Sequence, residues 1–256
     1  MLAHLKLVCY LIIKLLRYNT MLQLLTLLAL FVSLSNSWAS EAGKVTHLSG
    51  VLIADRLDGS QKILSVNSPV LEGDTLRTEE DTYARLKLTD NAEIVLRPET
   101  EFKLNQHHYQ ANEMQQNNSS MELIKGGMRA VTGLIGKNNP DSVKIGTPTA
   151  TIGIRGTHLG LLFCQDNCAN IPTPSGNIPA NGLHADVVEG AISLTNGAGT
   201  MNIGSGQFGY VKNAYTAPTL VPPTQGVQVT MPPSISQNNS KGKGVGKSGD
   251  TECAIQ

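Results

Sequence analysis

The chain has 256 residues, enough for one or two domains with a hydrophobic core. Only 16% of the residues are charged and 4% are aromatic, whereas glycine (25) and proline (12) are frequent, a composition that favours short strands and turns over helices. The formal net charge is zero, so no basic excess indicates nucleic-acid binding, and we expect no nucleic-acid partner.

The N-terminal segment has the pattern of a secretory signal. Its only charges, Lys6, Lys14 and Arg17, precede an apolar run and then the small-residue stretch "SNSWAS". This order predicts export, with a signal peptide over 1–39 that is cleaved after Ala39. Cleavage would remove three of the 20 basic residues and no acidic ones, which leaves a mildly acidic mature chain.

Two alternatives concern the same segment. A start at Met21 would remove every positive charge ahead of the apolar run, so we favour Met1 or a start close to it. An uncleaved anchor over 18–34 would hold the protein on the inner membrane and would be its only membrane contact. The apolar run, 21–34, is short for a membrane span, so we favour a periplasmic protein.

Residues 43–104 alternate short apolar runs with turns, which is typical of an all-β fold. The stretch "YARLKL" (83–88) predicts three apolar residues facing inward and Arg85 and Lys87 facing outward to solvent. The polar residues 105–120 predict a long surface loop. His107 and His108 in that loop are expected to be solvated histidines; a metal site is the less favoured reading.

The segment 121–163 contains two glycine-rich stretches that could suggest phosphate binding. In "TGLIGKNN" the residue five positions before Gly136 is Val131 and the residue after Lys137 is Asn138, so the nucleotide-binding P-loop pattern is not met. We therefore expect neither a nucleotide nor another cofactor.

The second stretch, "ATIGIRGT" (150–157), is explained by the face on which its apolar residues lie. The apolar positions change from odd to even numbers after Pro148 and return to odd numbers after Gly156. Each change requires a bulge or corner, because side chains alternate faces along a strand. We expect a strand that ends in a bend, with Arg155 bonded to carbonyls or a carboxylate across it. A similar change occurs at Glu189-Gly190.

Two cysteines four residues apart, Cys164 and Cys168, flank the turn-prone pair Asp-Asn. A turn there would bring the two Cα atoms within disulfide range, and export would let the bond form. A metal site with His158 or His184 is the weaker alternative, since a second cysteine pair is missing. Three prolines in 165–181 predict a surface excursion after the second cysteine.

The last segment, 213–256, is rich in Pro, Gly, Ser and Asn and has few large apolar residues. Such a composition buries too little surface to offset the entropy of ordering the chain. We expect a disordered tail.

Four stretches carry a resemblance to a known family: "VLEGDTLRTEEDTYARLKLTDNAEIVLRPETEF", "LIKGGMRAVTGLIGK", "TPTATIGIRGT" and "VVEGAISL". They resemble the FecR-domain family of exported bacterial proteins over residues 44–211. The resemblance implies a β domain over 43–212, with short strands in a solenoid-like or roll-like arrangement; a β-sandwich is the alternative. The signature residues, which we expect to serve the fold rather than a ligand, are Gly73, Asp74, Gly126, Gly127, Pro148, Gly153, Arg155, Gly156, Thr157, Glu189 and Gly190.

In the founding type of this family, the domain relays a signal from an outer-membrane receptor to a cytoplasmic sigma factor. That task requires a cytoplasmic segment and a membrane span, whereas only residues 1–20 precede the apolar run here. We therefore expect the stand-alone type: an exported, non-enzymatic module that binds an envelope protein for signalling or as a scaffold. A membrane-anchored signal-transducing regulator is one alternative.

A periplasmic ligand- or glycan-binding module is the other alternative. It would need a cleft with a few polar groups and aromatic faces, and Trp38 lies in the signal. An enzyme is not indicated, because the sequence has no HExxH motif, no recognisable Ser/His/Asp arrangement and no spaced pair of carboxylates. We expect no catalytic residue.

Overall fold

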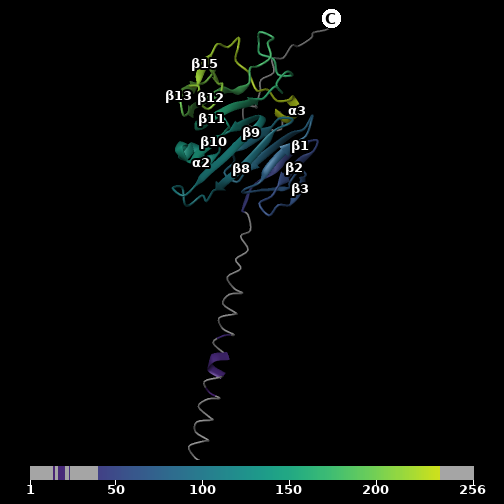
Figure 1. Cartoon of the computed structure of the whole chain (residues 1–256), viewed down its shortest axis with the longest axis vertical. Coiled ribbons are helices and arrows are strands. Elements are labelled where there is room, and N and C mark those ends of the chain that lie inside the picture. Colours follow the sequence, from purple (N-terminus) through teal and green to yellow (C-terminus); the bar gives the residue numbers. More distant parts are fainter. Residues whose placement is uncertain (1–13, 15–16, 21–22, 24–39, 237–256) are drawn as a thin grey trace, which may run out of the picture. The chain divides into compact units, whose positions relative to one another are not determined.

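Strands dominate the computed structural model, which describes residues 14, 17–20, 23 and 40–236 (Figure 1). The chain divides into two units, Met1–Trp38 and Ala39–Gln256. In the first unit the described residues are helical. Among the described residues, no helix has both the length and the apolar character needed to cross a bilayer. The predicted signal and the alternative anchor fall mostly outside the described residues and stay predictions.

The second unit contains a single connected sheet of 15 strands. The strands are β1 (Glu41–Ser49), β2 (Leu52–Asp55), β3 (Gln61–Leu64), β4 (Pro69–Leu71), β5 (Thr75–Thr78), β6 (Tyr83–Leu88), β7 (Glu93–Leu96), β8 (Glu101–His108), β9 (Asn118–Val131), β10 (Val143–Gly146), β11 (Thr151–Cys164), β12 (Gly182–Asn196), β13 (Gly199–Gly204), β14 (Phe208–Val211) and β15 (Thr219–Val221). The helical elements of this unit are short: α2 (Leu134–Asn138), η1 (Pro140–Ser142) and α3 (Pro233–Ser236).

The sheet is mixed and branched. Its main path runs β15-β14-β12-β11-β10-β9-β7-β6-β1-β4, a branch from β9 continues through β8, β5 and β2 to β3, and β13 adds to β12. The β9–β10 pair is parallel and the other pairs are antiparallel. The all-β prediction is confirmed. The solenoid-like arrangement is not seen, because the strands join into one open mixed sheet instead of stacked coils.

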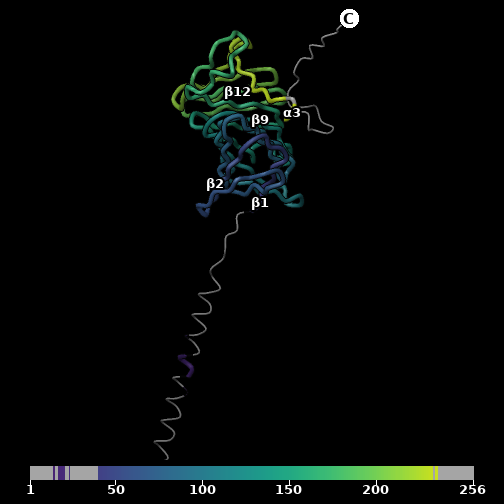
Figure 2. Tube along the Cα trace, turned by 90° about the vertical axis from the view of Figure 1, so that its right-hand side faces the viewer, coloured from purple at the N-terminus to yellow at the C-terminus, as the bar shows by residue number. Residues whose placement is uncertain are grey.

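The three longest strands, β9, β11 and β12, each change pairing partner along their length. β9 pairs with β8 up to Lys125 and with β7 from Met128 onward. β12 pairs with β14 before its bulge and with β13 after it. The lower and upper parts of the domain in Figure 2, labelled β2 and β12, are connected through these long strands. The predicted bends at Gly156 and at Glu189-Gly190 are confirmed, since the β11–β12 register shifts there.

The main hydrophobic core follows the predicted alternation. Ala84, Leu86 and Leu88 of β6 are all buried in it. Arg85, expected to face solvent, is also buried, with 4% of its surface exposed, and this corrects the prediction. The reason is that Arg85 pairs with Val95 of β7, which belongs to a second apolar cluster on the other side of the sheet.

That second cluster is formed largely by a segment that we expected to be disordered. Val227, Val229, Met231 and Ile235 are buried against Val95, Leu162 and the two cysteines of the 164–168 loop. We call residues 226–235 the strap. Because β15 and the strap are ordered, the disordered tail cannot begin at 213; the remainder, 237–256, lies outside the described residues.

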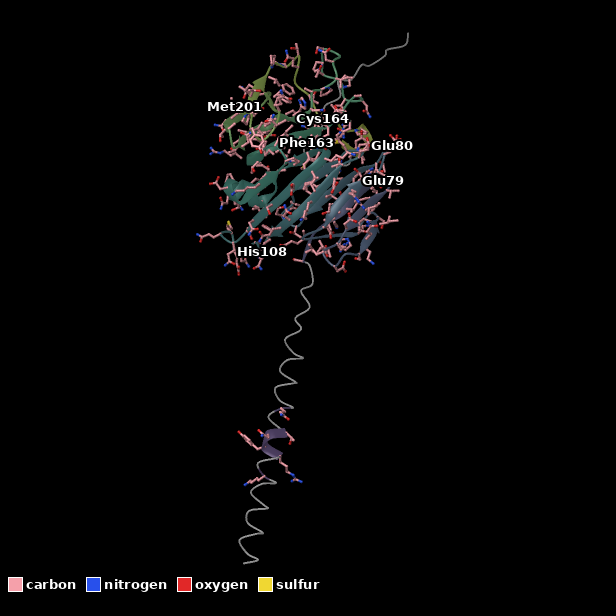
Figure 3. The ribbon with its side chains drawn as sticks, in the orientation of Figure 1. Glu79, Glu80, His108, Phe163, Cys164 and Met201 are labelled. Atoms are coloured by element: carbon pink, nitrogen blue, oxygen red, sulfur yellow. A yellow bond between two sulfur atoms is a disulfide. The ribbon has the colours of Figure 1, made fainter. Side chains whose placement is uncertain are left out.

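The predicted loop over 105–120 is also shorter than expected. β8 continues to His108, which Figure 3 labels near the lower edge of the domain, and β9 begins at Asn118. His107 is 3% exposed and bonded to Thr89 and Ser119, at 2.9 and 3.0 Å, so it is a buried histidine and not a solvated one. A register shift between Leu104 and Gln106 turns its side chain inward.

Candidate functional site

Two signature glycines face each other across the β11–β12 bend. Gly156 has φ +57° and Gly190 has φ +82°. A Cβ at Gly190 would lie 2.5 Å from the carbonyl oxygen of Gly156, whereas nothing lies within 4 Å of the position of a Cβ at Gly156. Gly190 is therefore required for close approach, and Gly156 for its backbone conformation alone.

Thr157 fixes the same bend with its buried hydroxyl. Its Oγ1 donates to the carbonyl of Ala191 at 2.7 Å and accepts from the amide of Arg155 at 3.2 Å. Its own amide donates to Thr132 Oγ1 at 2.9 Å. Thr157 thus bonds the backbone of the bulge within the chain itself.

Gly126 and Gly127 form the corresponding bend in β9. Gly126 has φ +83°, and a Cβ there would lie 2.5 Å from Thr100 Oγ1. Thr100 Oγ1 accepts from the amide of Gly127 and donates to its carbonyl, both at 3.0 Å. Because Gly126 and Gly127 have no side chains, the turn before β8 can pack directly on the β9 backbone.

The signature residues Gly73, Asp74 and Pro148 lie in turns between strands. Gly73 (φ +86°) turns the chain between β4 and β5, next to the buried Asp74. The carboxylate of Asp74 lies 3.2 Å from Arg56 Nε and accepts a hydrogen bond from the amide of Leu71 at 2.9 Å. Burial raises the pKa of Asp74, and the bond from Leu71 and the charge of Arg56 oppose that rise. Pro148 lies in the turn between β10 and β11, as the change of apolar face predicts.

Arg155 does not have the role we expected. Its side chain is exposed, and no hydrogen bond or ion pair of its guanidinium occurs among the described residues; only its amide is bonded. It lines a hollow of about 310 Å³ with Lys144, Thr151, Gly153 and Ser193. A Cβ at Gly153 would lie 2.6 Å from Ser193 Oγ, so a side chain there would require the serine hydroxyl to rotate. Glu189, on the outer side of the β12 bend, is exposed.

The cysteine pair forms the predicted disulfide. Cys164 and Cys168 are joined, with their Cα atoms 5.6 Å apart, at the end of β11 where the 165–181 excursion begins (Figure 3). The two histidines of the metal alternative have other partners: His158 accepts from Arg129 Nε at 3.2 Å, and His184 Nε2 lies 2.8 Å from the carbonyl of Ala180. Within 40–236, no group of three or more His, Cys, Asp and Glu residues is arranged to hold a metal ion.

Sequence reasoning missed a buried ionic cluster that fixes the strap. Arg129 and Asp186 are 2% and 3% exposed, and Arg129 Nη2 lies 3.2 Å from Asp186 Oδ1. Arg129 Nη1 donates to the carbonyl of Val229, and the amide of Val229 donates to Asp186 Oδ2 at 3.0 Å. Burial raises the pKa of Asp186 against the effect of Arg129, and burial together with the Arg129 charge lowers the pKa of His158 to about 4.

The ionic cluster bonds the backbone carbonyl and amide of Val229 in the strap, and not a side chain of the strap. Arg97 adds a further bond from its Nη1 to the carbonyl of Thr230. Gly160 allows the close approach, because a Cβ there would lie 2.8 Å from Val229 Cβ. The strap is therefore held through its main chain at Val229 and Thr230, and its end, from Pro233, belongs to α3.

The β2–β3 hairpin presents an unpaired strand edge. Within the described part of the chain, β3 pairs with β2 alone. Ile63 of β3 is 79% exposed and stands opposite Ile53 of β2. Leu57, in the turn between the two strands, is 72% exposed. The edge thus combines free main-chain groups with large apolar side chains, which a partner strand can cover.

Comparisons with known proteins agree with the family expected from the sequence. Residues 74–193 match the family model described as "FecR protein". No curated protein matches the chain.

Solved structures give weaker likenesses. Two crystal structures of a proposed anti-sigma factor from Parabacteroides distasonis ATCC 8503, at 2.50 and 1.65 Å resolution, align with a TM-score of 0.44 and 10% identity over 60% of this chain and 61% of the other. A cell surface anchoring domain aligns with a TM-score of 0.24 and 19% identity, over 24% of this chain and 82% of that one. The family match shows that this chain contains a FecR domain over residues 74–193.

Proposed function

We propose that the protein is an exported, non-enzymatic FecR-domain module that binds another protein of the cell envelope, for signalling or as a scaffold. The observation that carries the proposal is the free edge of β3, with Ile63 79% exposed beside Ile53. The FecR domain supports a non-catalytic role, and the signal pattern of residues 1–39 supports export.

The edge favours an extended partner segment. An added strand would bond the outer main-chain groups of β3 and place its own side chains beside Ile63. Natural sheets protect edges that must stay free, for example with proline or charge, and the edge strand β4 begins with Pro69. β3 has one charged residue, Lys62, next to its most exposed apolar side chain. We therefore expect a partner strand with an apolar residue opposite Ile63.

In-cell photo-crosslinking tests this proposal. The full chain carries a photoreactive amino acid at position 63, and material captured in the envelope is identified by mass spectrometry. Tyr215 is a matched control position, because it is 91% exposed and lies outside the β2–β3 hairpin. The proposal predicts one envelope protein recovered repeatedly from position 63 and not from position 215. Equal capture at both positions, or no protein at position 63, would contradict it.

A further inference from the structure

The turn of the β2–β3 hairpin, whose strands are labelled at the lower right of the domain in Figure 1, fixes which main-chain groups of β3 are free. The amide of Arg56 donates to the carbonyl of Ser60 at 2.9 Å, which makes these residues a hydrogen-bonded pair. Hydrogen-bonded and non-hydrogen-bonded pairs alternate along an antiparallel ladder. The register continues from this pair and places Ala54 opposite Lys62, so Lys62 is bonded to β2 through its main chain.

The residues on either side of Lys62 have the opposite orientation. Gln61 lies opposite Asp55 and Ile63 lies opposite Ile53, and by the same alternation both are non-hydrogen-bonded pairs. The N–H and C=O groups of Gln61 and Ile63 therefore point away from β2. Within the described part of the chain, no other strand pairs with β3. The edge thus offers the donors and acceptors of two residues to an added strand.

Lys62 places a charge at the end of a row of residues that face the core. Its neighbours across the sheet, Ala54 of β2 and Leu76 of β5, are fully buried. Side chains at directly opposite positions share a face, so Lys62 extends on the core-facing side and Ile63 on the outer side. The side chain of Lys62 is exposed, and its ammonium makes no ion pair with any described residue.

A strand that adds to β3 must cover this lysine. The residue of the added strand directly opposite Lys62 would lie on the same face, with the two Cβ atoms about 5 Å apart. An apolar residue there would remove water from the ammonium without supplying a counter-charge, whereas Asp or Glu would supply one. Inward-facing charges of this kind protect natural sheet edges against unspecific pairing. Lys62 therefore selects among strands that could otherwise add.

The same residue disfavours pairing with a second copy of this chain. Two antiparallel β3 strands related by a two-fold axis bond all the free groups of Gln61 and Ile63 in one register, with Gln61 of each copy opposite Ile63 of the other. That register puts the Lys62 side chains of the two copies directly opposite each other, and like charges in this position are destabilising. The edge therefore suits a different chain.

We infer, on the basis of the proposed function, that the β3 edge takes an extended segment of another protein in which Asp or Glu lies opposite Lys62 and apolar residues flank that acid. The main chain of the segment bonds Gln61 and Ile63. Its flanking side chains lie on the outer face, where one of them covers Ile63, and its carboxylate pairs with Lys62. Lys62 is thus the residue that determines specificity at this edge.

Fluorescence anisotropy on the full chain tests the chemistry of the partner. The probes are two labelled peptides, acetyl-Ser-Thr-Val-Glu-Val-Thr-Ser-amide and the same peptide with Lys in place of Glu. The variants are Lys62→Glu, which reverses the charge, and Lys62→Arg, which keeps it. Lys212→Glu is the matched control, because Lys212 is an exposed lysine outside the hairpin and its replacement changes the net charge equally.

The parent chain is expected to bind the Glu peptide roughly tenfold more tightly than the Lys peptide, because an opposite-charge pair replaces a like-charge pair across the strands. Lys62→Glu should reverse this order. Lys62→Arg and Lys212→Glu should preserve it. Light scattering should show a monomeric parent chain at the concentrations of the titration.

Three results would overturn the inference. They are equal affinity for the two peptides or binding of neither, an order of affinity that Lys62→Glu leaves unchanged, and a dimer of the parent chain that Ile63→Lys dissolves. Photo-crosslinking from position 63 decides the proposed function separately. Capture of one envelope protein there, undiminished by Lys62→Glu, would sink the role of Lys62 alone, whereas no capture by the parent chain would sink the proposed function itself.

Discussion

The glycine bends and the β2–β3 hairpin differ in what their residues do. Gly126, Gly156 and Gly190 hold positive φ angles at points where long strands change partners, and the backbone groups around them are already bonded. In the hairpin, Ile63 is exposed and its strand has an unpaired edge. The family match over 74–193 includes the bends and excludes the hairpin. The features that identify the family therefore build the fold, and recognition is expected outside them.

The largest expected effect comes from breaking the buried cluster under the strap. Arg129→Met leaves Asp186 buried without its counter-charge and should lower the free energy of unfolding by about 3–5 kcal/mol. Urea unfolding of the full chain measures this loss.

The double variant Arg129→Met/Asp186→Leu is the control for the charge. It removes both charges and should recover part of the stability, because no buried charge is left unpaired. If the free energy of unfolding of the double variant fell by the sum of the losses in the two single variants, this account of the cluster would be contradicted.

A β-branched residue at the β11 bend should have the next largest effect. Gly156→Val should cost near the upper end of the roughly 1–3 kcal/mol typical of a strained backbone position, because valine disfavours positive φ. Gly156→Asn should cost less, since asparagine tolerates this conformation and no atom lies within 4 Å of the position of a Cβ there. Thermal unfolding distinguishes the two, and equal stability of Gly156→Val and the parent chain would refute the conformational role.

Removal of the disulfide should have a smaller effect. The loop between Cys164 and Cys168 is short, so the double change to alanine should cost about 2 kcal/mol in the loop-entropy account. Urea unfolding under oxidising conditions measures it. A loss well above that value would mean that the bond also holds the strap, whose Val227 and Val229 share a cluster with both cysteines.

The pH dependence of stability provides a weaker test of the same cluster. The pKa of His158 is about 4 in the folded chain, below its ordinary value of 6.5. Between these values the unfolded chain binds more protons, so stability should fall as the pH drops from 6.5 toward 4. His158→Gln should make this fall shallower. Arg129, which bonds His158 in the parent chain, is present in both proteins, so the difference between the two curves isolates the titration of His158; identical curves would exclude a contribution from His158.

The sequence predicted the regular parts of the fold because their signal is local. Ala84, Leu86 and Leu88 alternate with charged residues, and the changes of apolar face at Gly156 and Gly190 required bends. His107 was misplaced because the β8 bulge that turns it inward leaves no mark in the composition of a polar stretch.

The strap was missed for a different reason. Val227, Val229 and Met231 do alternate with polar residues, which was the available signal, but prolines flank them and the region as a whole has a disordered composition. What orders the strap is Arg129 and Asp186, which lie about a hundred and about forty residues earlier in the chain.

The most direct measurement compares partner capture and stability in one variant, Ile63→Lys. An exposed side chain away from the core should change the free energy of unfolding by no more than about 0.5 kcal/mol. A lysine on the edge should nevertheless block strand addition. The account predicts an unchanged melting temperature together with loss of the envelope protein that the parent chain captures. Retention of that partner by Ile63→Lys, at unchanged stability, would contradict the claim that recognition lies at the β3 edge.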